Sequence, residues 1–199
     1  MNLANKLTMF RVVLVPFFLV IMSVSEIPMR FLWALIIFIV ASITDMLDGK
    51  IARKYDMVSD FGKFLDPLAD KILVAAALIC FVELGWTKAW IVAVIMMREF
   101  AVSGVRLVAV QSEKKTVISA SIWGKLKTAF TMIAIIAILL MYILADFGLI
   151  YDIGVVSSES FGFPIVIISD VLMYITVLLT VISGIKYIYD YRECIDPRK

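Results

Sequence analysis

The chain has 199 residues, of which 63% are hydrophobic, and its mean hydropathy is +1.02. An ordinary soluble domain does not reach these values, so the composition predicts an integral membrane protein with one domain, residues 1–199. The net charge of +2 is too small to indicate a nucleic-acid partner. Histidine is absent and the two cysteines have no paired spacing. Any bound metal is therefore expected to take oxygen ligands, which favours a hard cation over zinc.

Six apolar stretches follow one another along the chain, and each has roughly the 20 residues that a helix needs to cross a bilayer. They cover residues 8–24, 31–48, 67–84, 88–108, 124–146 and 165–189. Before the first stretch, polar residues alternate with Leu3, Leu7 and Phe10, which predicts a short amphipathic segment in the membrane interface. The predicted fold class is all-α, with six transmembrane helices after this segment.

The basic residues predict the orientation in the membrane, because cytoplasmic connections carry an excess of Lys and Arg. If the N-terminus is cytoplasmic, only Arg30 and Lys88 lie outside. The other side then receives Lys6, Arg11, Lys50, Arg53, Lys54, Lys63, Lys71, Arg98, Arg106, Lys114, Lys115, Lys125, Lys127, Lys186, Arg192, Arg198 and Lys199. Both termini are therefore predicted to be cytoplasmic. Residues 146–164 would form a long external loop, and nothing in that loop resembles a site.

Four aspartates stand where the second apolar stretch ends and the third begins. Asp45 and Asp48 are three residues apart and Asp66 and Asp70 are four apart, so each pair shares one face of a helix. The polar residues between the pairs are expected to form a cytoplasmic loop, with Pro67 in the first turn of the third helix. Carboxylates next to the hydrocarbon are costly and by default functional. Four that converge would repel one another unless cations bound, and two metals commonly clamp a phosphoryl displacement.

The residues between the aspartates suit a ligand that carries a diphosphate. Gly49 and Gly62 let a backbone or a ligand approach closely, and Ala52 keeps the same face small. Arg53 can present a planar fork of donors to the diphosphate. The alternative is that the aspartates merely pair with nearby lysines for packing. That alternative accounts for a single aspartate better than for four in this register.

The stretch TDMLDGKIARKYDMVSDFGKFLDPLADK resembles the signature of the CDP-alcohol phosphotransferase family, DxxDGxxAR followed by GxxxDxxxD, and fills each of its defining positions. The resemblance implies a six-helix membrane fold, a homodimer and a dinuclear site for Mg²⁺ or Mn²⁺ at the cytoplasmic surface. A CDP-activated substrate would bind there, and an acceptor hydroxyl would displace CMP. The implied metal ligands are Asp45, Asp48, Asp66 and Asp70, of which Asp70 is also the candidate general base. The implied nucleotide and diphosphate contacts are Gly49, Ala52, Arg53 and Gly62.

The acceptor is expected to be recognised by the second half of the chain. Arg98 and Arg106 lie eight residues apart in MREFAVSGVRL, a little over two helical turns, and so roughly on one face. Ser121, Lys125 and Lys127 follow in SASIWGKLKT at the head of the fifth stretch. Together these residues predict a basic, hydroxyl-bearing pocket for a phosphate monoester. Basic residues at helix ends also bind lipid headgroups without specificity, which is the competing interpretation.

These segments and the opening NLANKLTMFRVVLVPFF resemble the phosphatidylglycerophosphate synthase branch of that family. The resemblance implies transfer of a phosphatidyl group from CDP-diacylglycerol to sn-glycerol 3-phosphate at the cell membrane, among membrane lipids. One alternative is another acceptor, namely inositol phosphate, serine or phosphatidylglycerol. The other is an ion transporter lined by aspartates, although a transporter would place its carboxylates near the bilayer midplane on broken helices.

Overall fold

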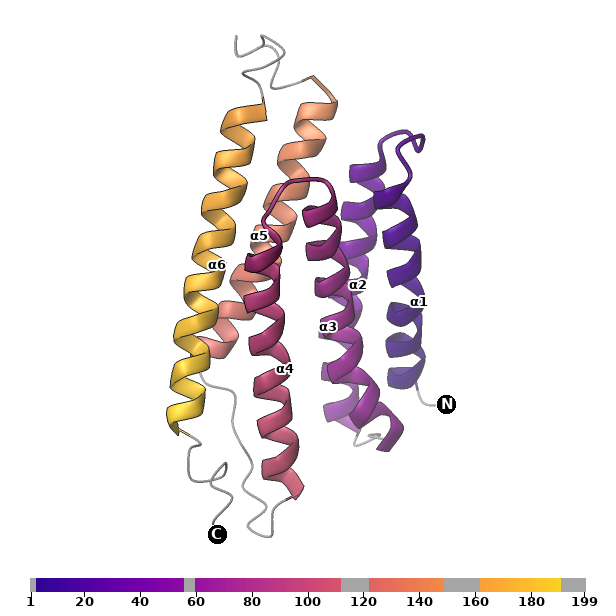
Figure 1. The fold of residues 1–199 in the computed structure, drawn as a ribbon. Coiled ribbons are helices and arrows are strands. Elements are labelled where there is room, and N and C mark those ends of the chain that lie inside the picture. Colours follow the sequence, from indigo (N-terminus) through magenta and orange to yellow (C-terminus); the bar gives the residue numbers. More distant parts are fainter. Residues whose placement is uncertain (1–2, 56–59, 112–121, 149–161, 191–199) are drawn as a thin grey trace.

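The computed structural model describes residues 3–55, 60–111, 122–148 and 162–190, with side chains for residues 7–45, 69, 71–105, 122–148 and 165–190. All regular structure within these residues is helical, as predicted (Figure 1). The helices are α1 Leu3–Ser23, α2 Arg30–Tyr55, α3 Asp60–Glu83, α4 Ala89–Gln111, α5 Ile122–Asp146 and α6 Gly162–Asp190.

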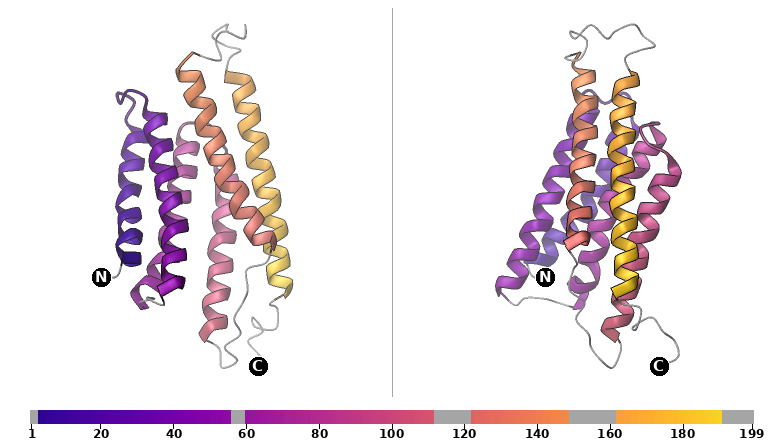
Figure 2. Two further views of the ribbon diagram at one scale, coloured as in Figure 1. Left: turned by 180° about the vertical axis from the view of Figure 1, so that it is seen from behind. Right: turned by 90° about the vertical axis from the view of Figure 1, so that its left-hand side faces the viewer.

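The helices run alternately up and down in one bundle (Figure 1). The first three form one group, in which α1 packs on α2 and α3, and the last three form another, in which α4 and α5 pack on α6. Contacts of α2 with α5 and of α3 with α4 join the two groups (Figure 2). The start of α1, the end of α2, the start of α3 and the end of α6 lie at the same end of the bundle. That end carries all four aspartate positions.

The bundle is apolar both inside and outside. Its interior is filled by fully buried side chains such as Phe18, Phe38, Phe81, Ile95 and Ile138. Large apolar side chains are also exposed on each of the six helices, which a lipid environment tolerates and water does not. By length and apolar composition, α5 and residues 165–190 of α6 qualify as membrane-spanning helices, and α1 contributes the shorter apolar helix Leu7–Ser23.

Two helices extend further at the aspartate end than the hydropathy predicts. Helix α2 continues to Tyr55 and α3 already begins at Asp60. The positions after Asp48 that were expected in a loop are therefore helical up to Tyr55. Lysine and arginine are good helix formers and favour helix C-terminal ends, whereas hydropathy detects only apolar side chains. Pro67 consequently lies inside α3 and not in its first turn.

The N-terminal part of α1 is also different from the prediction. The helix is continuous from Leu3 to Ser23, so the expected amphipathic segment is the first part of α1 itself. The side chains of Thr8 and Arg11 are 0% and 1% exposed. These two polar side chains of α1 therefore pack against protein.

Main-chain hydrogen bonds close the turn between α3 and α4. The N–H of Trp86 donates to the carbonyl of Phe81 (2.8 Å), and the N–H of Gly85 donates to that of Val82 (3.1 Å). These two bonds form a Schellman motif, and the rings of Phe81 and Trp86 make the hydrophobic contact that accompanies it, with centroids 5.2 Å apart. Gly85 adopts the left-handed φ of 73° that the motif requires.

Candidate active site

The four aspartates lie on two neighbouring helices. Asp45 and Asp48 belong to α2, and Asp66 and Asp70 belong to α3. Because both stretches are helical, the two aspartates of each pair lie about one turn apart along their helix. Helix α2 contacts α3. The side chain of Asp45 is described, and those of the other three lie outside the described residues. Among the side chains that the structure describes, no three Asp, Glu, Cys or His residues gather as a metal site would require.

Asp45 is paired with a buried arginine. Its Oδ1 lies 2.7 Å from Nη1 of Arg11, which reaches across from α1. The arginine side chain is 1% exposed, whereas that of Asp45 is 38% exposed. A buried guanidinium needs a negative partner, so Asp45 has a structural contact as well as its candidate role at a metal. Arg11 counted in the sequence only as a cytoplasmic charge, and its position a little over two turns into an apolar helix is the signal that it is buried.

The other predicted donor-site residues are placed only by their backbone. Gly49, Ala52 and Arg53 continue α2 beyond Asp48, and Gly62 lies in the first turn of α3. Their side-chain surroundings, like those of Arg106 on α4, lie outside the described residues, and Ser121 is outside them altogether. Gly49, Ala52 and Arg53 lie in the final two turns of α2, at the end of the bundle where the aspartates lie.

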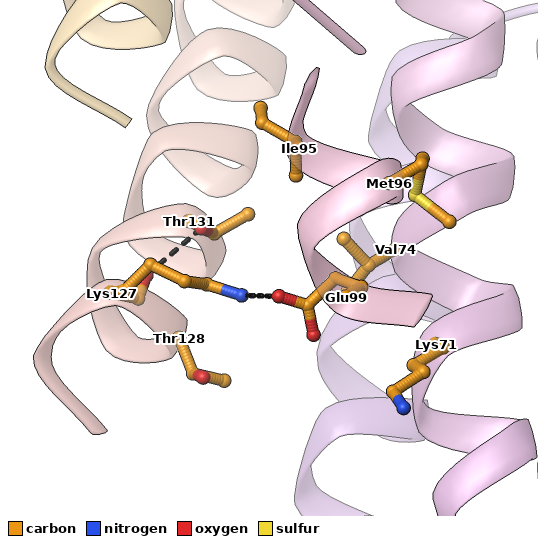
Figure 3. A pocket seen from close by; sticks show the side chains of 8 residues that line it. All are labelled: Lys71, Val74, Ile95, Met96, Glu99, Lys127, Thr128 and Thr131. Carbon is orange, nitrogen blue, oxygen red and sulfur yellow. Dashed lines mark hydrogen bonds and ion pairs between the residues drawn. The ribbon is translucent and has the colours of Figure 1, made fainter. Parts of the chain in front are cut away.

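A pocket opens between α3, α4 and α5 (Figure 3). Its walls combine apolar, hydroxyl and charged side chains, and its lining residues are Lys71, Val74, Ile95, Met96, Glu99, Lys127, Thr128 and Thr131. Its volume is about 20 Å³, which is room for one water-sized group. Lys71 directly follows Asp70 in α3, so the pocket adjoins the helix that carries the second aspartate pair.

Glu99 is the centre of a polar network in this pocket. Its Oε1 accepts hydrogen bonds from Nζ of Lys127 on α5 and from Nη1 of Arg98 (3.1 Å). Its backbone carbonyl accepts a bond from Oγ of Ser103 (2.9 Å), and that hydroxyl accepts one from Nζ of Lys71 on α3. The network therefore ties α4 to α3 and to α5. Lys127 is 3% exposed, and such a buried ammonium is stable only next to a carboxylate.

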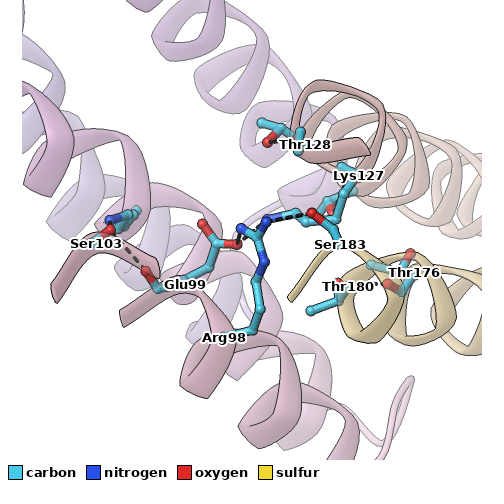
Figure 4. Close-up of polar contacts among 11 residues, drawn as sticks. Arg98, Glu99, Ser103, Lys127, Thr128, Thr176, Thr180 and Ser183 are labelled. Atoms are coloured by element: carbon cyan, nitrogen blue, oxygen red, sulfur yellow. Dashed lines mark hydrogen bonds and ion pairs between the residues drawn. The ribbon is translucent and has the colours of Figure 1, made fainter. Parts of the chain in front are cut away.

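Arg98 extends the network to α6. Its Nη2 donates to Oγ of Ser183 (2.6 Å), so the guanidinium lies between that hydroxyl and Glu99 (Figure 4). Gly184 makes this approach possible, because a Cβ there would come within 3.2 Å of the Cγ of Arg98. Ser183 continues a row of fully buried hydroxyls on α6 that includes Thr176 and Thr180. Small and hydroxyl side chains of this kind let helices pack closely in membranes.

The structure thus brings together part of the predicted acceptor site. Arg98 and Lys127 share one partner, Glu99, whereas Lys125 is exposed on α5 and does not line the pocket. Lys71 and Glu99 are not among the residues of the predicted acceptor site. The signal was present in each case, since both are charged side chains next to or within an apolar stretch.

Comparison with known proteins places this architecture in a family. The family model described as CDP-alcohol phosphatidyltransferase matches residues 1–182. A Bacillus subtilis protein named CDP-diacylglycerol–glycerol-3-phosphate 3-phosphatidyltransferase is 42% identical over 197 residues, covering 94% of this chain and 93% of that protein. A Haemophilus influenzae protein of the same name is 36% identical, covering 94% and 91%. A Mycobacterium tuberculosis protein named probable phosphatidylglycerophosphate synthase is 37% identical, covering 94% and 80%. The chain belongs to the CDP-alcohol phosphatidyltransferase family.

Proposed function

We propose that the chain transfers the phosphatidyl group from CDP-diacylglycerol to sn-glycerol 3-phosphate, giving phosphatidylglycerophosphate and CMP. The observation that carries the proposal is the similarity to the Bacillus subtilis enzyme, whose name states this donor and acceptor and which aligns with almost the whole of both chains. The complete aspartate signature on the adjoining helices α2 and α3 supports the donor half. The cationic pocket around Lys127 supports an acceptor with a phosphate.

The donor half rests on a fit between the residues and a pair of hard cations. The aspartates provide only oxygen ligands, which suits Mg²⁺ or Mn²⁺, and the partly exposed Asp45 is within reach of solvent. Asp45, Asp48, Asp66 and Asp70 would hold the two cations. When bound, the cations neutralise charge on the diphosphate and on the departing CMP. Arg53 binds the diphosphate, and the nearby small residues Gly49, Ala52 and Gly62 leave room for the nucleotide.

The reaction exchanges one phosphorus–oxygen bond for another. The terminal hydroxyl oxygen of glycerol 3-phosphate bonds to the phosphorus linked to diacylglycerol, and the anhydride bond from that phosphorus to CMP breaks. Asp70 accepts the proton of the hydroxyl, a general-base contribution of about 10²- to 10⁴-fold. Arg98, Arg106, Ser121, Lys125 and Lys127 form the acceptor-phosphate site in this proposal, with Lys127 the member already in the pocket.

We also propose how the enzyme lies in the membrane. The chain forms a single domain in the cell membrane, and all six of its helices cross the bilayer. Both termini are cytoplasmic, and the active site faces the cytoplasm. The positive-inside distribution of Lys and Arg and the apolar exposed faces of all six helices support this topology. The assembly is a homodimer, which rests on resemblance to the family.

CMP release from CDP-diacylglycerol by the purified protein tests the proposed function. We expect release to require both sn-glycerol 3-phosphate and Mg²⁺ or Mn²⁺, and to stop when the cations are chelated. Asp70→Asn should lower turnover at least a hundredfold while CDP-diacylglycerol binding survives. Asp170→Asn on α6 is the matched control, because it makes the same change near the opposite end of the bundle.

Several outcomes would refute this function. Turnover with inositol phosphate, serine or phosphatidylglycerol, and not with glycerol 3-phosphate, would show that the reaction type is as proposed but the acceptor is different. Ion flux in proteoliposomes without CMP release would favour a transporter. Near-normal turnover by the Asp70→Asn variant would show that another group is the base.

A further inference from the structure

The carboxylate of Glu99 uses only one of its two oxygens within the described network. Oε1 accepts the bonds from both Lys127 and Arg98. Oε2 accepts none from the residues that the structure describes, and Figure 3 shows it turned away from Lys127 into the space between Thr128 and Lys71. The side chain is 17% exposed and lines the pocket. A carboxylate oxygen that no described donor reaches is a strong site for a hydroxyl.

The size and charge of the pocket restrict what can approach Oε2. A volume of about 20 Å³ accommodates a hydroxyl group, so the phosphate of an acceptor would lie outside this space. A phosphate would also be repelled by the carboxylate, whereas the ammonium groups of Lys71 and Lys127 attract it. Val74, Ile95 and Met96 supply apolar walls next to the carbon that bears this hydroxyl. The arrangement fits an alcohol phosphate that carries a further hydroxyl two or three atoms from its phosphate.

The geometry points to Glu99 as a specificity-determining residue, whose Oε2 accepts a hydrogen bond from the middle hydroxyl of the glycerol phosphate acceptor. This inference rests on the proposed function. The terminal hydroxyl reacts, the phosphate contacts the lysines, and the middle hydroxyl donates to Glu99. A site built around a hydroxyl donor rejects an acceptor without it, because the bound acceptor then covers the carboxylate oxygen and leaves it without a partner.

Two acceptors that differ by one hydroxyl test this inference. sn-Glycerol 3-phosphate and 3-hydroxypropyl phosphate share the phosphate and the terminal hydroxyl, and the second lacks the middle hydroxyl. Rates of CMP release give kcat/KM for each. We expect the wild type to prefer glycerol 3-phosphate about ten- to a hundredfold, the range of a hydrogen bond to a charged group. Glu99→Met, which keeps the length but removes the acceptor, should bring the ratio close to one.

The ratio is measured within each variant, so it does not depend on how much active protein a preparation contains. If Glu99→Met does not fold, the double variant Glu99→Met/Lys127→Met carries the same test, because it does not leave the buried ammonium of Lys127 without its carboxylate, and Arg98 keeps its contact with Ser183. Thr128→Val is the matched control. It removes a pocket hydroxyl that donates to the carbonyl of Gly124 (3.0 Å), and it should keep the wild-type ratio.

The outcomes separate the inference from the proposed function. If the wild type releases CMP with neither acceptor, the proposed function fails. If it uses both acceptors equally well, or if the Glu99 variants keep the wild-type preference, the proposed function stands and the assignment of Glu99 is wrong. Loss of the preference in Thr128→Val alone would also overturn it, by moving the hydroxyl site to Thr128.

Discussion

At the residue scale, Asp45 has one contact that the structure shows and one role that is proposed, and the two make opposite demands on its environment. A metal ligand should be accessible, and its side chain is 38% exposed. The partner of a buried cation should be fixed, and Nη1 of Arg11 holds Oδ1 at 2.7 Å. A carboxylate has two oxygens, so contact with the arginine through Oδ1 leaves Oδ2 for another partner. Arg11 thereby compensates part of the negative charge that the aspartates concentrate at this end of the bundle.

This pairing predicts that Asp45→Asn destabilises the fold even without metal. The substitution leaves the guanidinium of Arg11 buried next to a neutral amide, and breaking a buried pair costs about 3–5 kcal/mol when both ends are fully buried. Because Asp45 is partly exposed, we expect about 2 kcal/mol. Unfolding in detergent with a chelator present measures this loss.

A double variant shows whether the loss of stability comes from the broken Arg11–Asp45 pair or from a general sensitivity of this region to substitution. Arg11→Met/Asp45→Asn removes both partners, so it should be more stable than Asp45→Asn alone. Asp66→Asn is the control, and in chelator it should change stability less than Asp45→Asn. Equal stability of Asp45→Asn and the wild type would mean that the Arg11 contact contributes nothing to folding.

At the scale of elements, two glycines differ in backbone conformation, because one ends a helix and the other lies inside one. Gly85 closes α3 with φ of 73°, whereas Gly104 lies within α4, and a Cβ at either position would meet nothing within 4 Å. Gly85→Ala should therefore cost about 1–2 kcal/mol through backbone strain alone. Gly104→Ala should stabilise by up to about 1 kcal/mol, because alanine is the better helix former. Thermal denaturation in detergent compares the two, and a stabilising Gly85→Ala would contradict the role of the Schellman motif.

The sequence predicts the helices better than their ends. Six apolar stretches correctly place six helices, because length and hydropathy report burial in an apolar medium. They miss the helical residues up to Tyr55 and from Asp60 onward, since charged residues form helices without being apolar. The sequence puts Glu99 next to Arg98, but it does not reveal that Lys127 and Ser183 contact this pair. Lys127 and Ser183 come from the distant helices α5 and α6, and only packing brings them to α4.

At the scale of the whole molecule, the outer surface is arranged in the order expected along a bilayer normal. Exposed apolar side chains cover the middle of the helices. Trp33 and Trp90 are exposed near one end, and Trp123 and Tyr189 are exposed near the other. Aromatic side chains favour the two interfaces of a membrane. In the proposed orientation, the end with Trp123 and the aspartates faces the cytoplasm.

Cysteine labelling tests this orientation. In a Cys80→Ser background, the natural Cys194 should react with a membrane-impermeant maleimide only after the cells are permeabilised, because the C-terminus is proposed to be cytoplasmic. Ser25→Cys, in the turn between α1 and α2, should react in intact cells when Cys80 and Cys194 are both serine. The alternation of the helices puts that turn at the opposite end from the start of α1 and the end of α6 (Figure 1). Cys80 is 1% exposed, so its removal prevents a background signal upon denaturation. Labelling of Cys194 in intact cells together with protection of Ser25→Cys would invert the topology, and it would place the aspartates on the outer face, away from cytoplasmic glycerol phosphate.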